Sequence, residues 1–326
     1  MSMANSGFAY LNARLRARRS QMVPEPFFQQ ALNQPFPDFV RSLGDTVYGS
    51  DVVGDDLADV DRAVANHMQR VVADLPGLVT GTLREAVNLL LLQADLNNLK
   101  TIIRGKAAGL GTEETKGRLV GGTLPEVLVN AMLQAPDVPS MAQVLQLPTH
   151  PLAKALRAVA SVQDPLALEV ALDRDFYANS LEKARRLREP TLASYFGLQV
   201  DATNLTTAFK LQALGVTATE GYFVPGGSHV GQVLFNRVAA GDFAAMEALN
   251  GTPLAPASTA RSLGELERAL RKILLDKAAQ GGKDTLGAGL ALDYIRRKEW
   301  EASRIRLLAR RAYFNLPAEA VAKEIA

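Results

Sequence analysis

The three histidines are the first residues to test for metal chemistry, and their spacing does not support it. His67, His150 and His229 lie far apart in the sequence, and none falls within metal-ligand spacing of another. The chain has no cysteine, so it has no thiolate nucleophile, disulfide or cysteine-ligated metal. Each histidine is interpreted as a surface or packing residue, and we expect no metal and no cofactor.

Two segments come close to known catalytic motifs without completing them. In "GGKDT", Gly281–Thr285, Asp284 stands where a phosphate-binding loop needs Ser or Thr, and Lys277 stands where its first glycine belongs. In "PGGSHVG", a serine nucleophile elbow would need glycine in place of Val230. An active site assembled from distant segments would need a polar pocket with shifted titrating groups. The sequence favours a protein that is not an enzyme and acts by contact.

Basic residues are the remaining candidates for a binding site. Arg104, Lys210 and Arg310 end three similar segments, and three copies around a pseudo-threefold axis would place them in a ring. The C-terminal stretch "YIRRKEWEASRIRLLARRAYF" is the most charged helix and could dock an acidic partner or an anionic membrane boundary. The alternative is a solvated face with local ion pairs. The predicted partner-binding residues are Arg104, Lys210, Arg310, Arg296, Arg297 and Arg306.

The composition predicts an all-α protein. Hydrophobic residues make up 48% of the 326 residues and aromatic residues only 6%, with leucine and alanine abundant. The net charge of +2 is too balanced for a general nucleic-acid binder. The longest leucine run, Leu89–Leu92, is far short of the roughly 20 apolar residues of a membrane span. The Arg-rich start could be a transit peptide, but Phe8, Leu11 and Leu15 share one helical face, which favours an amphipathic helix.

The positioning elements are three loose repeats of one pattern. The segments "DLNNLKTIIR", "DATNLTTAFK" and "EASRIRLLAR" begin at Asp95, Asp201 and Glu301. A second pattern, acid-x-Ala-aliphatic, precedes them at nearly constant distance and begins at Asp61, Glu169 and Glu267. A third, L-x-x-T, occurs at Leu43 with Thr46 and at Leu249 with Thr252, with Leu145 and Pro148 as a degenerate middle version. Copies of about 100 residues are domain-sized and too long for solenoid repeats.

The repeats predict three helical subdomains, 1–113, 114–219 and 220–326. Gly-rich punctuation around 109–126 and 215–231 marks the boundaries, and the second segment is predicted to be a short hairpin or an irregular loop. Chance similarity among Leu- and Ala-rich helices is the alternative. For Asp201, an N-cap of its own helix or a local ion pair is favoured over a chemical role.

Five segments together resemble the C subunit of V/A-type ATPases, called the d subunit in eukaryotic vacuolar enzymes. They are "FAYLNARLRARRSQ", "FVRSLGDTVYG", "QADLNNLKTIIRGKAAG", "DATNLTTAFKLQALG" and "YIRRKEWEASRIRLLARRAYFNLP". The resemblance runs from about residue 8 to about residue 317. It implies an all-α, funnel-shaped protein of three similar subdomains around a pseudo-threefold axis, in agreement with the repeats.

The resemblance also implies a function. The chain would be a non-catalytic central-stalk subunit on the cytoplasmic face of the membrane, peripheral and without a transmembrane segment. It would be the socket between the central shaft, built from D- and F-type subunits, and the proteolipid rotor ring, and would carry torque for ATP-coupled proton or sodium transport. Arg304, where the other copies have asparagine, and the degenerate middle L-x-x-T put exact threefold equivalence in doubt.

The alternative function is a cytoplasmic helical scaffold or adaptor unrelated to rotary motors. Because the repeats supply internal symmetry, we expect a monomer in isolation. Which ion is moved, and whether the complex makes or hydrolyses ATP, are properties of other chains of the complex.

Overall fold

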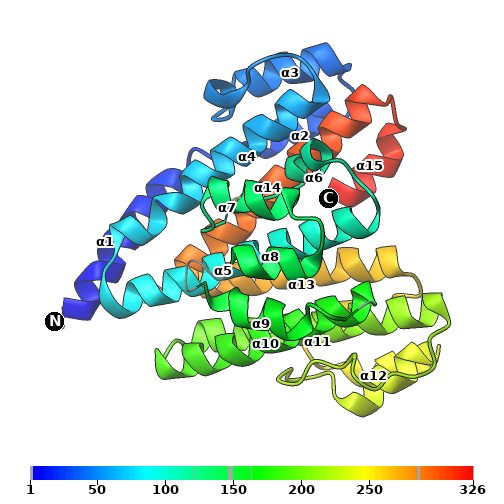
Figure 1. The fold of residues 1–326 in the computed structure, drawn as a ribbon. Coiled ribbons are helices and arrows are strands. Elements are labelled where there is room, and N and C mark those ends of the chain that lie inside the picture. The colour runs from blue at the N-terminus through cyan, green and yellow to red at the C-terminus, as the bar shows by residue number, and fades with distance from the viewer. Residues whose placement is uncertain (1–2, 121, 146–149, 163, 285–286, 326) are drawn as a thin grey trace. The chain divides into compact units, whose positions relative to one another are not determined.

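In the computed structural model, the described residues are 3–120, 122–145, 150–162, 164–284 and 287–325, and every regular element among them is a helix (Figure 1). The all-α prediction is therefore confirmed. Among these same residues, no helix combines the length and the apolar character that a bilayer crossing requires.

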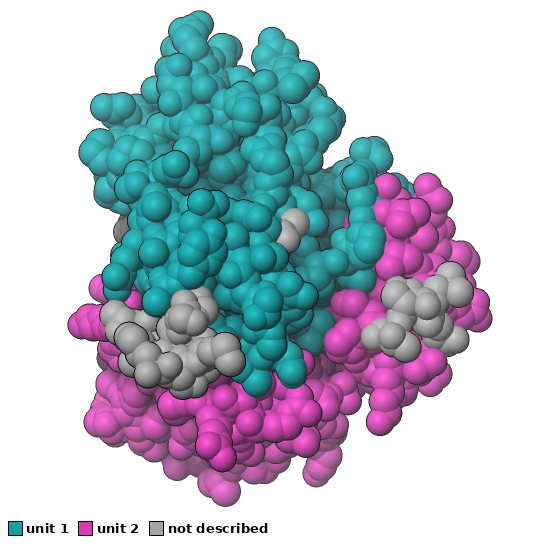
Figure 2. Space-filling view, turned by 90° about the vertical axis from the view of Figure 1, so that its left-hand side faces the viewer, with its two compact units in different colours: residues 1–126, 290–326 teal, residues 127–289 magenta. Residues whose placement is uncertain are grey.

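The chain divides into two compact units, residues 1–126 with 290–326, and residues 127–289 (Figure 2). The first unit contains α1 Met3–Arg19, α2 Glu25–Ala31, α3 Phe36–Gly44, η1 Gly49–Asp51, α4 Leu57–Ala73, η2 Leu75–Leu78, α5 Gly81–Ala107, α6 Thr112–Gly117, α14 Gly289–Tyr313 and α15 Ala318–Ile325. The second contains α7 Glu126–Gln134, α8 Val138–Val144, α9 Pro151–Val159, α10 Pro165–Arg186, α11 Pro190–Leu214, α12 Gln232–Ala239, η3 Phe243–Leu249, η4 Ala255–Ala257 and α13 Leu263–Gly281. The division into three sequence repeats stays a prediction.

The core of the first unit joins residues from both ends of the chain. Phe28 and Phe39 from the N-terminal helices pack with Met68 of α4 and with Ile305 and Leu308 of α14. Helix α14 thus belongs with the start of the chain, although the whole second unit lies between α14 and α5 in the sequence. Burial of such large side chains stabilises the fold by about 2 kcal/mol each.

The predicted amphipathic first helix is confirmed as α1. Its described side chains at Phe8, Leu11 and Leu15 are all buried, with Leu11 and Leu15 fully excluded from water. These residues are spaced three and four apart, which places them on one side of a helix.

The core of the second unit surrounds α11. Phe209 of this helix packs with Phe235 of α12, Leu249 of η3 and Leu266 of α13. Both α11 and α5 are buried around most of their circumference, polar residues included. A helix surrounded by other helices shows no single apolar stripe, which explains why these two long helices contain asparagine and aspartate among their leucines.

The helices with the acid-x-Ala-aliphatic pattern begin in the same way. Asp56, Asp164 and Ser262 cap α4, α10 and α13 with their side chains, and each cap lies five residues before the acid of the pattern. The caps at Asp56 and Ser262 are capping boxes. The repeated pattern therefore marks the second turn of a capped helix in all three cases.

The L-x-x-T pattern forms the same turn in its first and last copies. The Thr46 hydroxyl donates to the Leu43 carbonyl at 2.7 Å and accepts from the Tyr48 N–H. The Thr252 hydroxyl repeats this with the Leu249 carbonyl at 2.6 Å and with the Leu254 N–H. Of the degenerate middle copy, Pro148 lies outside the described residues.

The segment 215–231 is an irregular loop of turns. The predicted irregular loop is therefore confirmed, and the predicted short hairpin is wrong. The segment 109–126 contains the short helix α6, and the residues described between α6 and α7 form no regular element.

Candidate functional site

A buried aspartate in the middle of α11 holds the loop that follows this helix. The Asp201 carboxylate accepts hydrogen bonds from the backbone N–H groups of Ser228 (3.1 Å), His229 (3.1 Å) and Val230 (2.9 Å). Three consecutive N–H groups make a concave site for an anion, and here the anion is a side chain that is itself fully buried. The expected N-cap role is wrong, because α11 begins upstream at Pro190 and Asp201 lies within it.

Helix α5 makes the same contact in the first unit. The Asp95 carboxylate, also fully buried, accepts from the N–H groups of Thr123 (2.7 Å) and Leu124 (3.2 Å) and from the Thr123 hydroxyl. We call each of these arrangements an aspartate clasp. Each clasp fixes the entry of the chain into the next short helix, α7 or α12.

Glycine allows the loop to come this close to the carboxylate. A Cβ atom at Gly122 would lie 2.1 Å from Asp95 Oδ1, and a Cβ atom at Gly227 would lie 2.1 Å from Asp201 Oδ1. The two loops share the letters "GGT" and "GGS", and the second glycine of each pair is the one in contact. This shared Gly-Gly-hydroxyl signal is present in the sequence and identifies the partner of each aspartate.

One turn further along each helix, an asparagine pairs with the loop backbone. Asn204 donates from Nδ2 to the Val224 carbonyl and accepts from the Val224 N–H through Oδ1, both at 2.8 Å. Asn98 makes the same two bonds with Val120, also at 2.8 Å. The repeated D-x-x-N pattern is therefore a two-part device that satisfies backbone groups of a loop at least 20 residues away.

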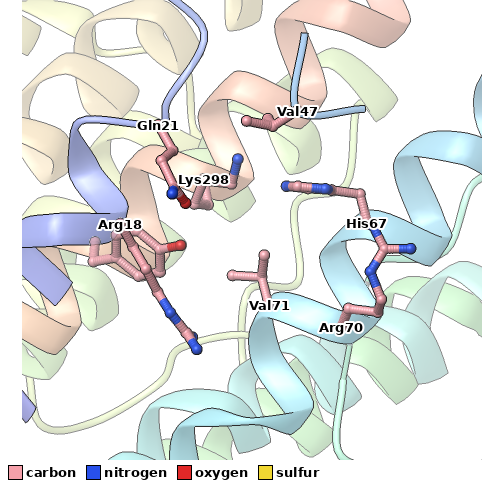
Figure 3. A pocket seen from close by; sticks show the side chains of 8 residues that line it. Arg18, Gln21, Val47, His67, Arg70, Val71 and Lys298 are labelled. Atoms are coloured by element: carbon pink, nitrogen blue, oxygen red, sulfur yellow. The ribbon is translucent and has the colours of Figure 1, made fainter. Parts of the chain in front are cut away.

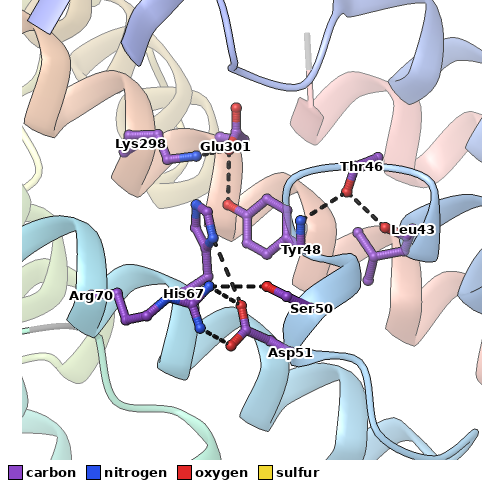
Figure 4. Close-up of polar contacts among 9 residues, drawn as sticks. All are labelled: Leu43, Thr46, Tyr48, Ser50, Asp51, His67, Arg70, Lys298 and Glu301. Carbon is purple, nitrogen blue, oxygen red and sulfur yellow. Dashed lines mark hydrogen bonds and ion pairs between the residues drawn. The ribbon is translucent and has the colours of Figure 1, made fainter. Parts of the chain in front are cut away.

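The third copy holds the beginning of the chain. Glu301 of α14 accepts from the Val23 N–H at 2.8 Å. It also accepts from the Tyr48 hydroxyl at 2.8 Å and pairs with Lys298 on its own helix (Figure 4). All four residues are buried. Because burial and the charge of Glu301 both disfavour a phenolate, the pKa of Tyr48 is raised well above 10. The last repeat thus closes onto the first, across 278 residues of sequence.

Arg304 replaces the asparagine in this copy and uses a different interaction. Its guanidinium forms a two-point ion pair with Glu25, with the Nη1 to Oε2 bond at 2.8 Å, and stacks 3.7 Å from the centre of the Phe28 ring. The hydrogen bond from Arg304 is the main reason that the pKa of Glu25 is lowered. Although Arg304 replaces the asparagine of the other copies, it still ties α14 to the N-terminal part of the chain, at Glu25 and Phe28.

The predicted basic residues near the end of α14 contact other parts of their own unit. Arg310 forms two bonds with the Asp61 carboxylate, at 2.8 and 3.1 Å, so the third basic position meets the acid of the first acid-x-Ala-aliphatic pattern. Arg306 donates to the Leu119 carbonyl at 2.7 Å and lies 3.6 Å from the Asp61 carboxylate. Burial lowers the pKa of Arg306, and the nearby Asp61 charge opposes this.

The other four predicted partner-binding residues differ in accessibility. Arg296 is buried and donates to Gln93 (2.6 Å) and Glu299 (2.5 Å). Arg297 keeps 42% of its side chain exposed while it pairs with Asp293. Arg104 is exposed and Lys210 is half-buried, each at the same place in its repeat.

Within the described residues, no group of three or more acidic or histidine side chains is placed to hold a metal ion. His67 is buried and packs 4.2 Å from the Tyr48 ring centre, whereas His229 contributes a backbone N–H to the Asp201 clasp. The sequence did not single out Tyr48, because its partner Glu301 lies 253 residues away in the sequence.

These features define an all-helical protein in which Asp95, Asp201 and Glu301, each on a long helix, accept hydrogen bonds from backbone N–H groups of distant segments. The chain belongs to the ATP synthase (C/AC39) subunit family, whose model matches residues 11–324.

Named relatives cover nearly the whole chain. The chain is 49% identical to the C subunit of the V-type ATP synthase of Thermus thermophilus over 319 residues, which cover 98% of both chains. It is 30% identical to the C subunit of the V-type ATP synthase of Deinococcus radiodurans, over 98% of this chain and 91% of the relative. It is 26% identical to the C subunit of the A-type ATP synthase of Methanothermobacter thermautotrophicus, over 93% and 83%.

Proposed function

We propose that this chain is a non-catalytic central-stalk subunit of a V/A-type rotary ATPase. It is seated at the cytoplasmic face of the membrane, between the shaft formed by D- and F-type subunits and the proteolipid ring, and passes torque for ATP-coupled proton or sodium transport. The observation that carries the proposal is the match to a C subunit of a V-type ATP synthase over 98% of the chain at 49% identity.

The clasps give this role a physical basis. A part that transmits torque must resist deformation between its grips, and buried charge-assisted hydrogen bonds hold loops more firmly than surface contacts do. Asp95, Asp201 and Glu301 tie three successive entry segments to three long helices, and the last tie leads back to the first segment. Each tie stiffens the compact unit in which it lies.

Four of the six predicted basic residues divide into two roles under this proposal. Arg104 and Arg297 present charge at the surface and are proposed to contact another protein of the complex, where rim charges orient an association. Arg306 and Arg310 are proposed to hold α14 in place within its own unit, through their bonds to Leu119 and Asp61.

The test is co-purification from gently solubilised membranes of the source cells, with tagged chain and identification of bound proteins by mass spectrometry. We expect recovery of the shaft subunits and the proteolipid, together with ATPase activity. The double variant Arg104→Gln/Arg297→Gln is expected to recover less of one partner, whereas Arg41→Gln, which alters a side chain that is 77% exposed on α3, recovers wild-type amounts. Recovery of soluble proteins alone would overturn the proposal and favour the scaffold alternative.

A further inference from the structure

A small cavity in the first unit lies among α1, α4 and α14. Its volume is about 150 Å³. It is lined by Arg18, Gln21, Val47, His67, Arg70, Val71, Tyr294 and Lys298 (Figure 3). No part of the aspartate clasps contributes to its wall, and none of the predicted partner-binding residues lines it.

Three cationic side chains face this cavity from three helices. Arg18 comes from α1, Arg70 from α4 and Lys298 from α14. Each of them has a carboxylate partner, Asp74, Asp51 or Glu301 respectively, but no acidic side chain is among the residues that line the cavity. Each guanidinium or ammonium group has more N–H donors than its carboxylate partner accepts.

His67 adds a buried polar group without a hydrogen bond. Its side chain is 9% exposed, and neither ring nitrogen makes a hydrogen bond to any described residue. A carboxylate oxygen of Asp51 lies 3.8 Å from Nδ1, and a contact with the Val47 backbone raises the pKa of His67. Burial, and then the charge of Lys298, lower the pKa of His67 to about 4, so it is neutral at pH 7 and keeps one N–H donor. A buried donor of this kind is destabilising unless something accepts from it.

We propose that this cavity binds a tetrahedral oxyanion of the phosphate class. Two guanidinium groups and one ammonium group suit its charge, and Gln21, Tyr294 and His67 offer neutral donors around it. At about 30 Å³ per water, the cavity holds about five waters. That space accommodates inorganic phosphate or one terminal phosphate group. A bound oxyanion would link α1, α4 and α14 next to Lys298, which also pairs with Glu301.

The first measurement uses the purified chain in phosphate-free buffer at pH 7 and constant ionic strength. Inorganic phosphate is titrated by calorimetry and by NMR of the histidine rings, with ATP and ADP as separate arms. Because the chain has three histidines, the His67 signals are identified by their loss in His67→Gln. We expect saturable binding that shifts the His67 signals and leaves those of His150 and His229 in place. ATP or ADP that shifts the His67 signals as inorganic phosphate does would show that the site also takes the terminal phosphate group of a nucleotide.

The matched variants are Arg18→Gln and Arg19→Gln, on neighbouring residues of α1. Arg18 lines the cavity, whereas Arg19 pairs with Asp293 and does not line it. We expect Arg18→Gln to weaken phosphate binding at least tenfold and Arg19→Gln to leave it within twofold of wild type. Equal effects of the two variants, or phosphate titration of the wild type without a shift at His67, would overturn the proposal. Neither result bears on the central-stalk assignment, which rests on other observations.

Discussion

Replacing Asn204 by leucine removes both bonds that tie Val224 to α11. Leucine has nearly the shape of asparagine but neither donates nor accepts, so the Val224 N–H and carbonyl lose their partners at 2.8 Å. Val224 and Asn204 are both fully buried, and water does not replace the lost bonds. Each unsatisfied buried group is destabilising by about 1–3 kcal/mol, so the loss of both partners in Asn204→Leu is expected to lower stability by about 2–6 kcal/mol.

Asn98→Leu provides the matched comparison, because it deletes the same atoms from the same position of the other aspartate-containing repeat. Its partner Val120 is only half-buried, so water can satisfy part of what the asparagine leaves. We expect a loss of about 1–2 kcal/mol, smaller than that of Asn204→Leu.

Hydrogen exchange over residues 220–231 is the direct assay for Asn204→Leu, since a chain with two compact units need not unfold in a single transition. The Val224 amide is expected to lose protection selectively. Urea unfolding of both variants gives the free-energy change. A loss below about 0.5 kcal/mol for Asn204→Leu, or equal losses for the two variants, would refute the reasoning that buried loop pairing governs stability here.

Three further predictions concern single side chains. Gly227→Ala is expected to destabilise by about 1–3 kcal/mol because its Cβ would meet a carboxylate oxygen at 2.1 Å, whereas Gly231→Ala, with open space around it, is expected to be neutral in urea unfolding. Arg310→Gln should lower the melting temperature by leaving the buried α4 acid without its two-point partner, a loss of about 1–2 kcal/mol, and Arg41→Gln should change it little. The pKa of His67 is lowered to about 4 in the folded chain, so the contribution of neutral His67 to stability is complete above pH 6.5 and is lost as pH falls toward 4. After allowance for water in the cavity, this contribution is about 1–2 kcal/mol. His67→Gln should therefore flatten the pH profile of urea unfolding between pH 6.5 and 4.

The helical class and the repeated polar positions could be predicted from the sequence because they depend on local pattern. Asp95 and Asp201, with their asparagines one turn later, were found as echoes of one another. The role of the two aspartates could not be predicted in this way, because an aspartate near a helical run is most often a cap. The evidence for a buried clasp lies in glycine residues over 20 positions away.

The basic residues show why side-chain partners are harder to predict than elements. Arg310 was interpreted as one of a ring of three equivalent charges, yet it pairs with Asp61, which is 249 residues away in the sequence. No periodicity within a helix reports such a contact, because the chain must first close so that α14 packs beside α4. Arg304 became understandable only when Glu25 and Phe28 were placed next to it.

The proposed coupling role is tested most directly in membrane vesicles that contain the complete ATPase and from which this chain has been removed. The measurement is ATP-driven formation of an ion gradient, recorded with ATP hydrolysis, before and after the purified chain is added back. We predict that hydrolysis persists without the chain while the gradient fails to form, and that adding the chain restores the gradient. A gradient of equal size with and without the chain would contradict the account.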